Sequence, residues 1–290
     1  MPSIIGCDFT SRPTKQKPIT LAVGALVDPG ADPKRALPTS LYFHLHELLS
    51  FTSLDDFEQA LKGRRPGVAA PWVGGFDLPF GLPRELIQTL GWPLQWDACV
   101  NQFRALERAR IRELFKNFCD KRSVGSKFAH RATDYIANSS PSMKWVNPPV
   151  AFMMHAGLPT LIRANLTLPG IRHGDAKRIG LETYPGMLAR EIIGHQSYKS
   201  DDKHKQNRER LLAREKILDT LAAGHYSLGF KVKADNTLWN QMLADASGDS
   251  LDALICALQA TWGLMQFRQG DALYGLAPEM DPLEGWILTC

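Results

Sequence analysis

The sequence predicts a single-domain α/β protein in which a mixed β-sheet is flanked by helices. Two observations predict this class. The first 50 residues hold three short apolar or alternating stretches separated by turn residues, which is typical of successive strands. A fourth apolar stretch follows a helical segment, and most of the remaining chain has helical character. The composition, 44% hydrophobic and 22% charged, is that of an ordinary globular protein.

Three strands are expected at the start of the chain. Residues 3–8 form a short apolar run, and residues 19–27 (ITLAVGALV) are continuously apolar, as in a central strand. Residues 40–48 (SLYFHLHEL) alternate between apolar and polar positions, which indicates a strand with one wetter face. Because a Pro- and Gly-rich connection joins the second and third stretches, we expect an antiparallel meander.

A helix and a fourth strand follow the meander. Ser53 can cap a helix over residues 53–63, and Gly63 can end it. Residues 71–77 (PWVGGFD) are expected to form a buried strand that ends at Asp77, because the prolines that follow prevent regular continuation.

The next segments are mainly helical. Residues 84–120 are expected to be helical, and residues 121–147 to form a loop with some helix. Residues 150–165 indicate a helix in which Gly157 and Pro159 are potential breaks.

One more strand is expected before the C-terminal helices. Residues 178–183 form a strand closed by Glu182, and a helix follows it. Residues 207–221 are amphipathic, and residues 238–264 contain two helical pieces. The apolar tail PLEGWIL is expected to form a last strand or a sheet edge.

Composition also narrows the location of the protein. No stretch approaches the roughly 18 apolar residues of a membrane helix, so no membrane partner is expected. The N-terminus lacks the features of a secretory signal. The five cysteines are scattered and form no CxxC pair, which favours reduced thiols in a cytoplasmic protein.

Four acids occupy unusual positions. Asp8, Asp77 and Glu182 each end an apolar strand, and Asp252 lies in the first turn of an apolar helix beside Asp249. Ligands gather at the carboxyl ends of strands in such sheets. Carboxylates that meet there repel each other unless they are protonated or share a cation. Oxygen ligands of this kind suit Mg²⁺ or Mn²⁺, and two such ions can promote phosphodiester hydrolysis.

Each acid also has a purely structural explanation. Asp8 can cap a turn, and Asp77 can begin the Pro-rich turn that follows it. Glu182 can pair with Arg178 or Arg190. Asp249 and Asp252 can be ordinary acids at a helix N-terminus, where the helix dipole favours them.

A basic segment offers a surface for phosphates. Between Arg104 and Arg131 there are nine basic residues against three acidic ones, in a chain whose net charge is only +4. The alternative is a solvated helix face. The residues expected to contact nucleic acid are Arg104, Arg108, Lys121, Arg122, Lys127 and Arg131. They lie in a mainly helical basic insertion, residues 84–175, within a single domain of residues 1–290.

Four motifs carry a family resemblance. In order they read GCDFTS, GGFDLPFGLP, ETYPGML and DSLDALICALQA. Their order and spacing resemble an uncharacterised bacterial and archaeal family of predicted RNase-H-like nucleases, over about residues 4–264. The SYK at residues 197–199 is similar to the family pattern as well.

The resemblance implies an RNase-H-like fold, with a five-stranded mixed sheet of three antiparallel and two parallel strands flanked by helices. In that fold the first and fourth strands are parallel neighbours. This implies that Asp8 and Asp77 lie side by side, with Glu182 and Asp252 approaching from later elements.

The expected function is therefore a Mg²⁺- or Mn²⁺-dependent phosphodiester hydrolase, a nuclease, that acts on nucleic acid. Asp8, Asp77, Glu182 and Asp252 are the expected catalytic metal ligands, and Asp249 is a further ligand. The alternative is a non-catalytic nucleotide- or nucleic-acid-binding protein on the same fold. ATP binding ranks lower, because VGGFDLPFG lacks the Lys and Ser or Thr of a phosphate loop.

Overall fold

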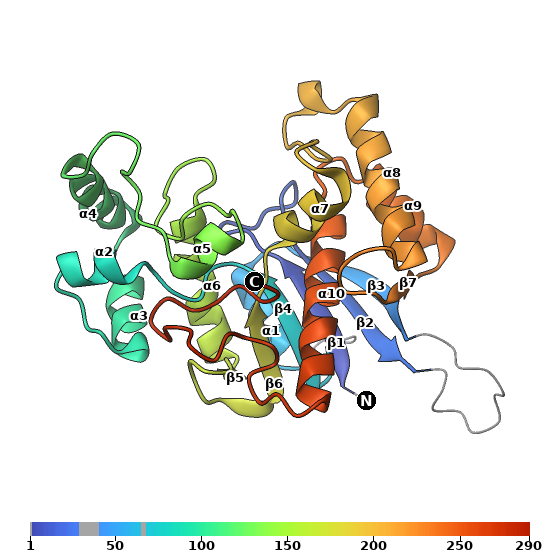
Figure 1. Ribbon diagram of the computed structural model, residues 1–290, viewed down its shortest axis with the longest axis horizontal. Coiled ribbons are helices and arrows are strands. Elements are labelled where there is room, and N and C mark those ends of the chain that lie inside the picture. The colour runs from blue at the N-terminus through green and yellow to red at the C-terminus, as the bar shows by residue number, and fades with distance from the viewer. Residues whose placement is uncertain (1, 29–40, 65–67) are drawn as a thin grey trace.

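The computed structural model describes residues 2–28, 41–64 and 68–290. Figure 1 shows a central sheet with helices on both faces. The strands are β1 (Ser3–Asp8), β2 (Ile19–Val27), β3 (Tyr42–Phe51), β4 (Trp72–Asp77), β5 (Leu166–Thr167), β6 (Asp175–Glu182) and β7 (Lys231–Lys233). The helices are α1 (Leu54–Leu61), α2 (Arg84–Thr89), α3 (Trp96–Arg104), α4 (Arg108–Asp120), α5 (Ala132–Ile136), α6 (Val150–Arg163), α7 (Pro185–Ile193), α8 (Arg208–Ala223), α9 (Asn236–Ala244) and α10 (Asp249–Arg268), with a short 3₁₀ turn at Lys203–Lys205.

The sheet is mixed and its strand order is β5-β6-β4-β1-β2-β3-β7. β1, β2 and β3 form the antiparallel meander. β4, β6 and β5 then add in parallel on one side, and β7 adds in parallel to β3 on the other. The predicted α/β class with a mixed sheet is confirmed. The expected count of five strands is wrong, because two edge strands of two and three residues were too short to show any periodicity.

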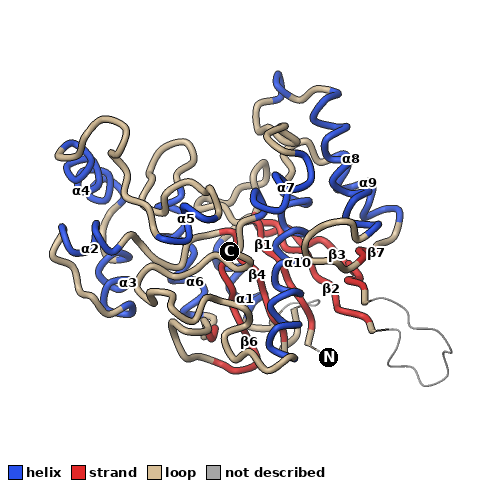
Figure 2. Tube along the Cα trace, viewed as in Figure 1, coloured by secondary structure: helices blue, strands red, loops and turns tan. Residues whose placement is uncertain are grey.

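Each face of the sheet is covered by its own hydrophobic core. On one face, Leu21 packs in a core with Phe57 of α1 and Leu158 of α6. On the other face, Ile4 packs in a core with Leu254 of α10 and with residues of α7, α8 and α9. Figure 2 shows the three-layer arrangement that results, with α10 crossing the middle of the sheet. Strands that are buried on both faces account for the continuous apolar runs of β1 and β2.

Two glycines bring α10 unusually close to the sheet. A Cβ atom on Gly6 would lie 2.1 Å from both the Ala253 carbonyl oxygen and the Ala257 amide nitrogen, and one on Gly75 would lie 2.3 Å from the Cys256 carbonyl oxygen. These are backbone atoms of α10, which cannot move aside without moving the helix. The glycines therefore set the distance between the strand ends and the first turn of α10.

We expect Gly6→Ala to destabilise the protein at or above the upper end of the roughly 1–3 kcal/mol that overpacking usually costs. The methyl group has no space against the α10 backbone, so the helix must shift. Denaturant unfolding measures the loss. Gly125→Ala is the control, because a Cβ there meets nothing within 4 Å and adds only the cost of its positive φ. Equal losses in the two variants would show that close packing of α10 is not the cause.

Several expected elements differ from the structure. α6 runs unbroken through Gly157 and Pro159, because its buried face packs in the core along its whole length. Residues 84–120 form three helices, and residues 121–147 contain only α5. The tail from residue 269 onward, all of which is described, contains turns and no strand. The connection at residues 29–40 lies outside the described residues. Among the described helices, none has both the length and the apolar character needed to cross a bilayer.

Candidate functional site

Two of the predicted acids are direct neighbours at one edge of the sheet. β1 and β4 pair in parallel, and their last residues, Asp8 and Asp77, are register partners. The apolar runs that end in these acids therefore deliver both carboxyl groups to the same end of the sheet. Because α10 packs on β1 and β4 through Gly6 and Gly75, its first turn approaches the same place. Asp249 and Asp252 belong to that turn.

The charges of these acids act on one another. Burial raises the pKa of Asp8 well above its usual value, and the negative charges of Asp252 and Asp249 raise it further. Burial and the charge of Asp252 raise the pKa of Asp77 to about 7. Within the described ranges, no hydrogen bond or ion pair reaches either side chain from a donor. Asp8 and Asp77 are therefore acids without a direct ion-pair partner, and the nearby Lys199 charge offsets the rise in their pKa values only in part.

The two acids of α10 are neutralised by lysines. The Lys199 ammonium forms an ion pair with Asp252, and the Tyr198 hydroxyl donates a hydrogen bond to the same carboxylate. The Lys17 ammonium lies 2.7 Å from an oxygen of Asp249. Asp252 is 0% exposed, so its carboxylate contacts this lysine and tyrosine and does not reach solvent. Asp252, predicted as a metal ligand, is thus engaged by Lys199 and Tyr198 in this arrangement.

Glu182 belongs to a separate buried ion cluster. Its carboxylate accepts hydrogen bonds from both terminal nitrogens of Arg131, at 2.7 and 2.9 Å, and from the Phe80 amide at 2.8 Å. Arg131 also pairs with Asp134 at 2.8 Å. Burial raises the pKa of Glu182 and the Arg131 charge opposes that rise. The pairing expected with Arg178 or Arg190 is wrong: the partner is Arg131, whereas Arg178 pairs with Asp175 and Arg190 donates a hydrogen bond to Tyr184.

This cluster corrects the role expected for Arg131. The residue is 1% exposed, and its guanidinium is occupied by two carboxylates and by the Glu284 carbonyl oxygen. It has no free donor to offer to a phosphate on the surface. The sequence gave no indication that Arg131 is buried. It follows a polar loop, and one of its two acidic partners, Glu182, comes from the distant strand β6.

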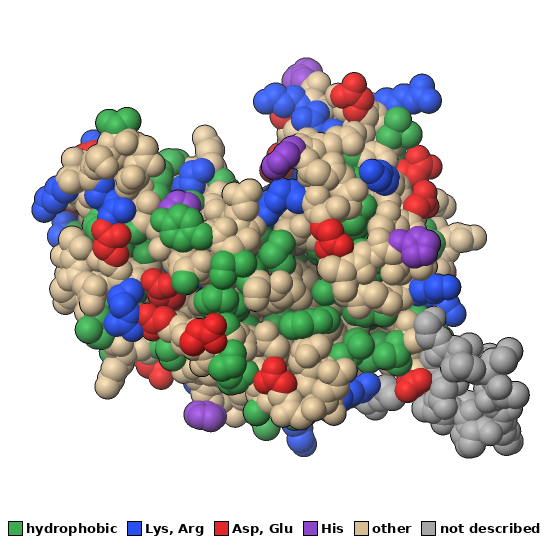
Figure 3. Space-filling model, in the orientation of Figure 1, with side chains coloured by type: hydrophobic (Ala, Val, Ile, Leu, Met, Phe, Trp, Pro, Cys, Tyr) green, Lys and Arg blue, Asp and Glu red, His purple; other side chains and the backbone are tan. Residues whose placement is uncertain are grey.

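The unpaired acids open into a cavity of about 560 Å³, which we call the carboxylate cavity. The residues of its wall that carry charge are Asp8, Asp77, Glu182, Asp249, Asp201, Lys17, Lys199 and Arg131. The loop after β1 and the loop before α6 complete the wall with apolar and hydroxyl side chains. Figure 3 shows a hollow between the side of the molecule that carries α4 and the side that carries α8. In Figure 1 the ends of β1 and β4 lie toward this hollow.

The type of the side chains and their arrangement point in different directions when the site is considered for a metal ion. Among the described residues, no group of three or more His, Cys, Asp or Glu side chains is arranged to hold one. The chemistry of the two free acids nevertheless suits a hard divalent cation, because Asp8 and Asp77 are adjacent carboxylates with raised pKa values and no cationic partner in direct contact. A cation at this pair fits the residues present, whereas Glu182 and Asp252 are already occupied.

Lys17 is a site residue that sequence reasoning missed. It lies in the loop between β1 and β2, and Asp8 is the register partner of Thr20. Any residue shortly before Thr20 must therefore return to the end of β1 that carries Asp8. This hairpin geometry is a signal that the sequence contains. Lys17 bridges Asp249 and Asp201, both at 2.7 Å.

The remaining basic residues lie in two places. Lys121 and Lys127 are exposed near the end of α4, and Arg122 is paired with Glu85 and stacks on the Phe118 ring. Arg104 and Arg108 instead line a cavity beside the carboxylate cavity. The expected basic surface is thus divided.

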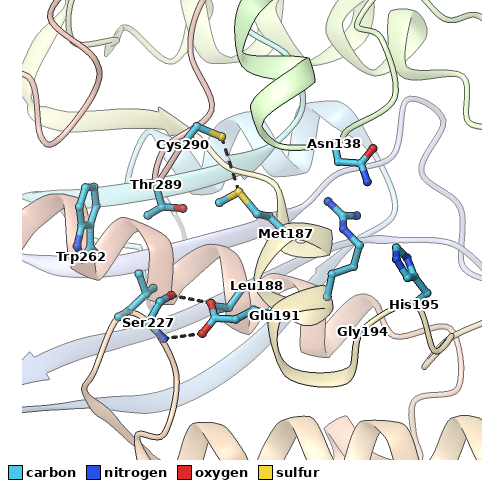
Figure 4. Close-up of a pocket in the computed structure, with 12 residues that line it drawn as sticks. Asn138, Met187, Leu188, Glu191, Gly194, His195, Ser227, Trp262, Thr289 and Cys290 are labelled. Atoms are coloured by element: carbon cyan, nitrogen blue, oxygen red, sulfur yellow. Dashed lines mark hydrogen bonds between the residues drawn. The ribbon is translucent and has the colours of Figure 1, made fainter.

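A further cavity of about 620 Å³ lies between α7 and the C-terminal tail (Figure 4). Its charged groups are already engaged, since Glu191 accepts hydrogen bonds from the Ser227 amide and hydroxyl, both at 2.7 Å. On the side of the cavity formed by the C-terminal tail, the Cys290 thiol contacts the Met187 sulfur. None of the acids predicted from the sequence lines it.

Comparisons of this chain with protein-family models, with curated proteins and with solved structures find no match.

Proposed function

We propose that this protein is a Mg²⁺- or Mn²⁺-dependent phosphodiester hydrolase, a nuclease, with an RNase-H-like fold. One observation carries the proposal: Asp8 and Asp77 are adjacent, unpaired carboxylates in a cavity large enough for part of a substrate. Burying two such acids without a partner is unfavourable, and function is the usual reason for such an arrangement.

The arrangement of the longer strands supports the fold assignment. Without the two short edge strands, the order is β3-β2-β1-β4-β6, with an antiparallel meander followed by parallel additions. This is the arrangement that the family resemblance implies, in which the first and fourth strands are parallel neighbours. In this proposal β5 and β7 are additions to that core, and the helices α2 to α6 make up most of the insertion proposed at residues 84–175 between β4 and β6.

Asp8 and Asp77 are the residues that would hold the cation, with Asp249 at the edge of the same cavity. The chemistry that such a cation supplies is Lewis acidity toward the phosphodiester and its attacking water. The chain itself contributes the charge balance. Lys17 and Lys199 line the cavity and present ammonium groups to a phosphate, and Arg131 keeps Glu182 neutralised at the base of the site.

Titration with Mn²⁺ in a calorimeter tests the proposal directly. We expect the unchanged protein to bind Mn²⁺ and Asp8→Asn to lose at least tenfold in affinity, because one of two charged ligands is removed. Asp120→Asn, an exposed acid at the end of α4, is the matched control and should bind as the unchanged protein does. Cleavage of a labelled oligonucleotide in Mn²⁺, and its loss in chelator, is the second readout. Equal Mn²⁺ affinity in Asp8→Asn and the control would refute the assignment.

The ion pairs of Lys17 and Lys199 favour a second candidate, a nucleic-acid-binding protein without hydrolysis. In that case the lysines satisfy the acids of α10 permanently, and no cation is needed. The two candidates differ in a simple measurement. The non-catalytic protein should bind nucleic acid equally well with and without Mn²⁺, and its affinity should fall steeply with salt.

A further inference from the structure

A cluster of arginines lies next to the carboxylate cavity. Arg104 at the end of α3, Arg108 at the start of α4 and Arg163 at the end of α6 line a cavity of about 650 Å³, which we call the arginine cavity. Ser11, three residues after Asp8, lines both this cavity and the carboxylate cavity. The two cavities are therefore neighbours along the loop that follows β1.

Most of the positive charge around the arginine cavity has no acidic partner. Arg163 is neutralised by Glu58, at 2.7 Å. Four other arginines in this region, Arg12, Arg104, Arg108 and Arg112, form no ion pair with a carboxylate in the part of the chain that the structure describes. Four guanidinium groups without counter-ions are an unusual arrangement, since arginines on a protein surface commonly find carboxylates, as Arg110 does with Glu113.

The position of Arg108 shows that the cluster is built into the fold. Its guanidinium donates a hydrogen bond to the Ser11 carbonyl oxygen, at 2.9 Å, and lies 5.0 Å from the centre of the Phe152 ring. Arg112 lies 5.2 Å from the same ring. Burial and the positive charges of Arg12 and Arg112 lower the pKa of Arg108. The fold thus holds like charges together, an arrangement that an anion would stabilise.

The other polar groups of the wall do not supply that anion. The His155 ring nitrogen Nε2 donates a hydrogen bond to the Leu106 carbonyl oxygen, at 2.9 Å, and burial lowers the pKa of the ring. Asn101 and Ser11 are neutral. A phosphate group suits this environment, because its two non-bridging oxygens share the negative charge and each can accept hydrogen bonds from more than one guanidinium group.

We propose that the arginine cavity binds backbone phosphates of a single-stranded nucleic acid whose adjoining segment enters the carboxylate cavity. The proposal rests on the proposed function, because the same strand occupies both cavities. A single strand is favoured over a duplex because both sites are concave and meet at one loop residue, so that an unpaired backbone can follow them. Ser11 marks the point where the strand passes from one cavity to the other.

Fluorescence anisotropy with a short labelled single-stranded oligonucleotide, in chelator, tests this proposal apart from catalysis. We expect Arg104→Gln to weaken binding about tenfold, the loss of one charge-assisted contact. Arg108→Gln should do the same, and the salt dependence should become less steep in each variant. Arg110→Gln is the control, because it removes the same charge from the same helix, on a residue that lies outside the cavity wall.

The outcomes separate the two proposals. If the double variant Arg104→Gln with Arg108→Gln binds the strand as tightly as Arg110→Gln does, the arginine cavity is not a nucleic-acid site. If a duplex of the same sequence binds as tightly as the single strand, the choice of a single strand is wrong. Thermal unfolding of each variant shows that it is folded. Mn²⁺ binding by Arg104→Gln should be unchanged, so a failure of the metal hypothesis appears only in the Asp8 experiment.

Discussion

In metal-free buffer at neutral pH, Asp77→Asn is expected to unfold at a higher denaturant concentration than the unchanged protein, while losing its response to Mn²⁺. Burial and the charge of Asp252 raise the pKa of Asp77 from 3.8 to about 7. Asparagine has nearly the same shape without the charge. The substitution therefore removes an unfavourable charge from the folded state and removes a metal ligand at the same time.

The sign of the pH dependence follows from the direction of that shift. A carboxyl group with a raised pKa in the folded state holds its proton there more tightly than in the unfolded chain. Its contribution to stability is complete below about pH 4 and is lost as the pH rises toward 7. The free energy of unfolding of the unchanged protein should thus fall over this interval, by on the order of a few kcal/mol. In Asp77→Asn the fall should be smaller.

Denaturant unfolding at several pH values, in chelator and in Mn²⁺, measures both effects. Mn²⁺ should stabilise the unchanged protein, because a ligand that binds only the folded state favours it by mass action. It should leave Asp77→Asn nearly unaffected. Asp120→Asn serves again as the exposed control. A variant that is less stable than the unchanged protein at every pH would mean that the Asp77 carboxylate has a structural partner and is not an unpaired ligand.

The sheet could be predicted where local pattern and tertiary structure agree. β1, β2 and β4 are apolar runs buried on both faces, and the ends of β1 and β4 at Asp8 and Asp77 match the predicted ends. β5 and β7 could not be predicted, because strands of two and three residues depend on their neighbours. Pro159 suggested a helix break that does not occur. The burial of Leu158 and Leu161 on the core side outweighs the lost hydrogen bond.

The candidate site was predictable on its acidic side and not on its basic side. A strand that ends in an acid is visible in the sequence, and parallel pairing then makes Asp8 and Asp77 neighbours. The cations that face the acids are harder to recognise, since only the hairpin geometry brings Lys17 back to Asp8 and no nearby pattern marks Lys199. Lys17 lies in a polar loop, and Lys199 precedes a charged helix. Counter-ion pairing depends on the folded geometry, so charge patterns along the chain did not reveal it.

Arg131 carries the largest expected effect on stability. The sequence places it in the basic segment and predicts contact with phosphate, whereas the structure buries it between Glu182 and Asp134. Arg131→Met preserves much of the volume and removes the charge. Two buried carboxylates then lose their counter-ion, and breaking a buried pair in this way costs about 3–5 kcal/mol. Denaturant unfolding should show a loss of this size.

The pH dependence and a matched control distinguish burial from phosphate binding at Arg131. Without the arginine, only the hydrogen bond from the Phe80 amide still opposes the burial that raises the pKa of Glu182, so Arg131→Met should recover stability as the pH falls and the carboxyl group binds a proton. Arg110→Met, at an exposed pair with Glu113, should cost less than about 1 kcal/mol. A stable Arg131→Met that binds nucleic acid weakly would restore the role expected from the sequence. An unstable one would assign Arg131 to holding β6 and α5 together beneath the site.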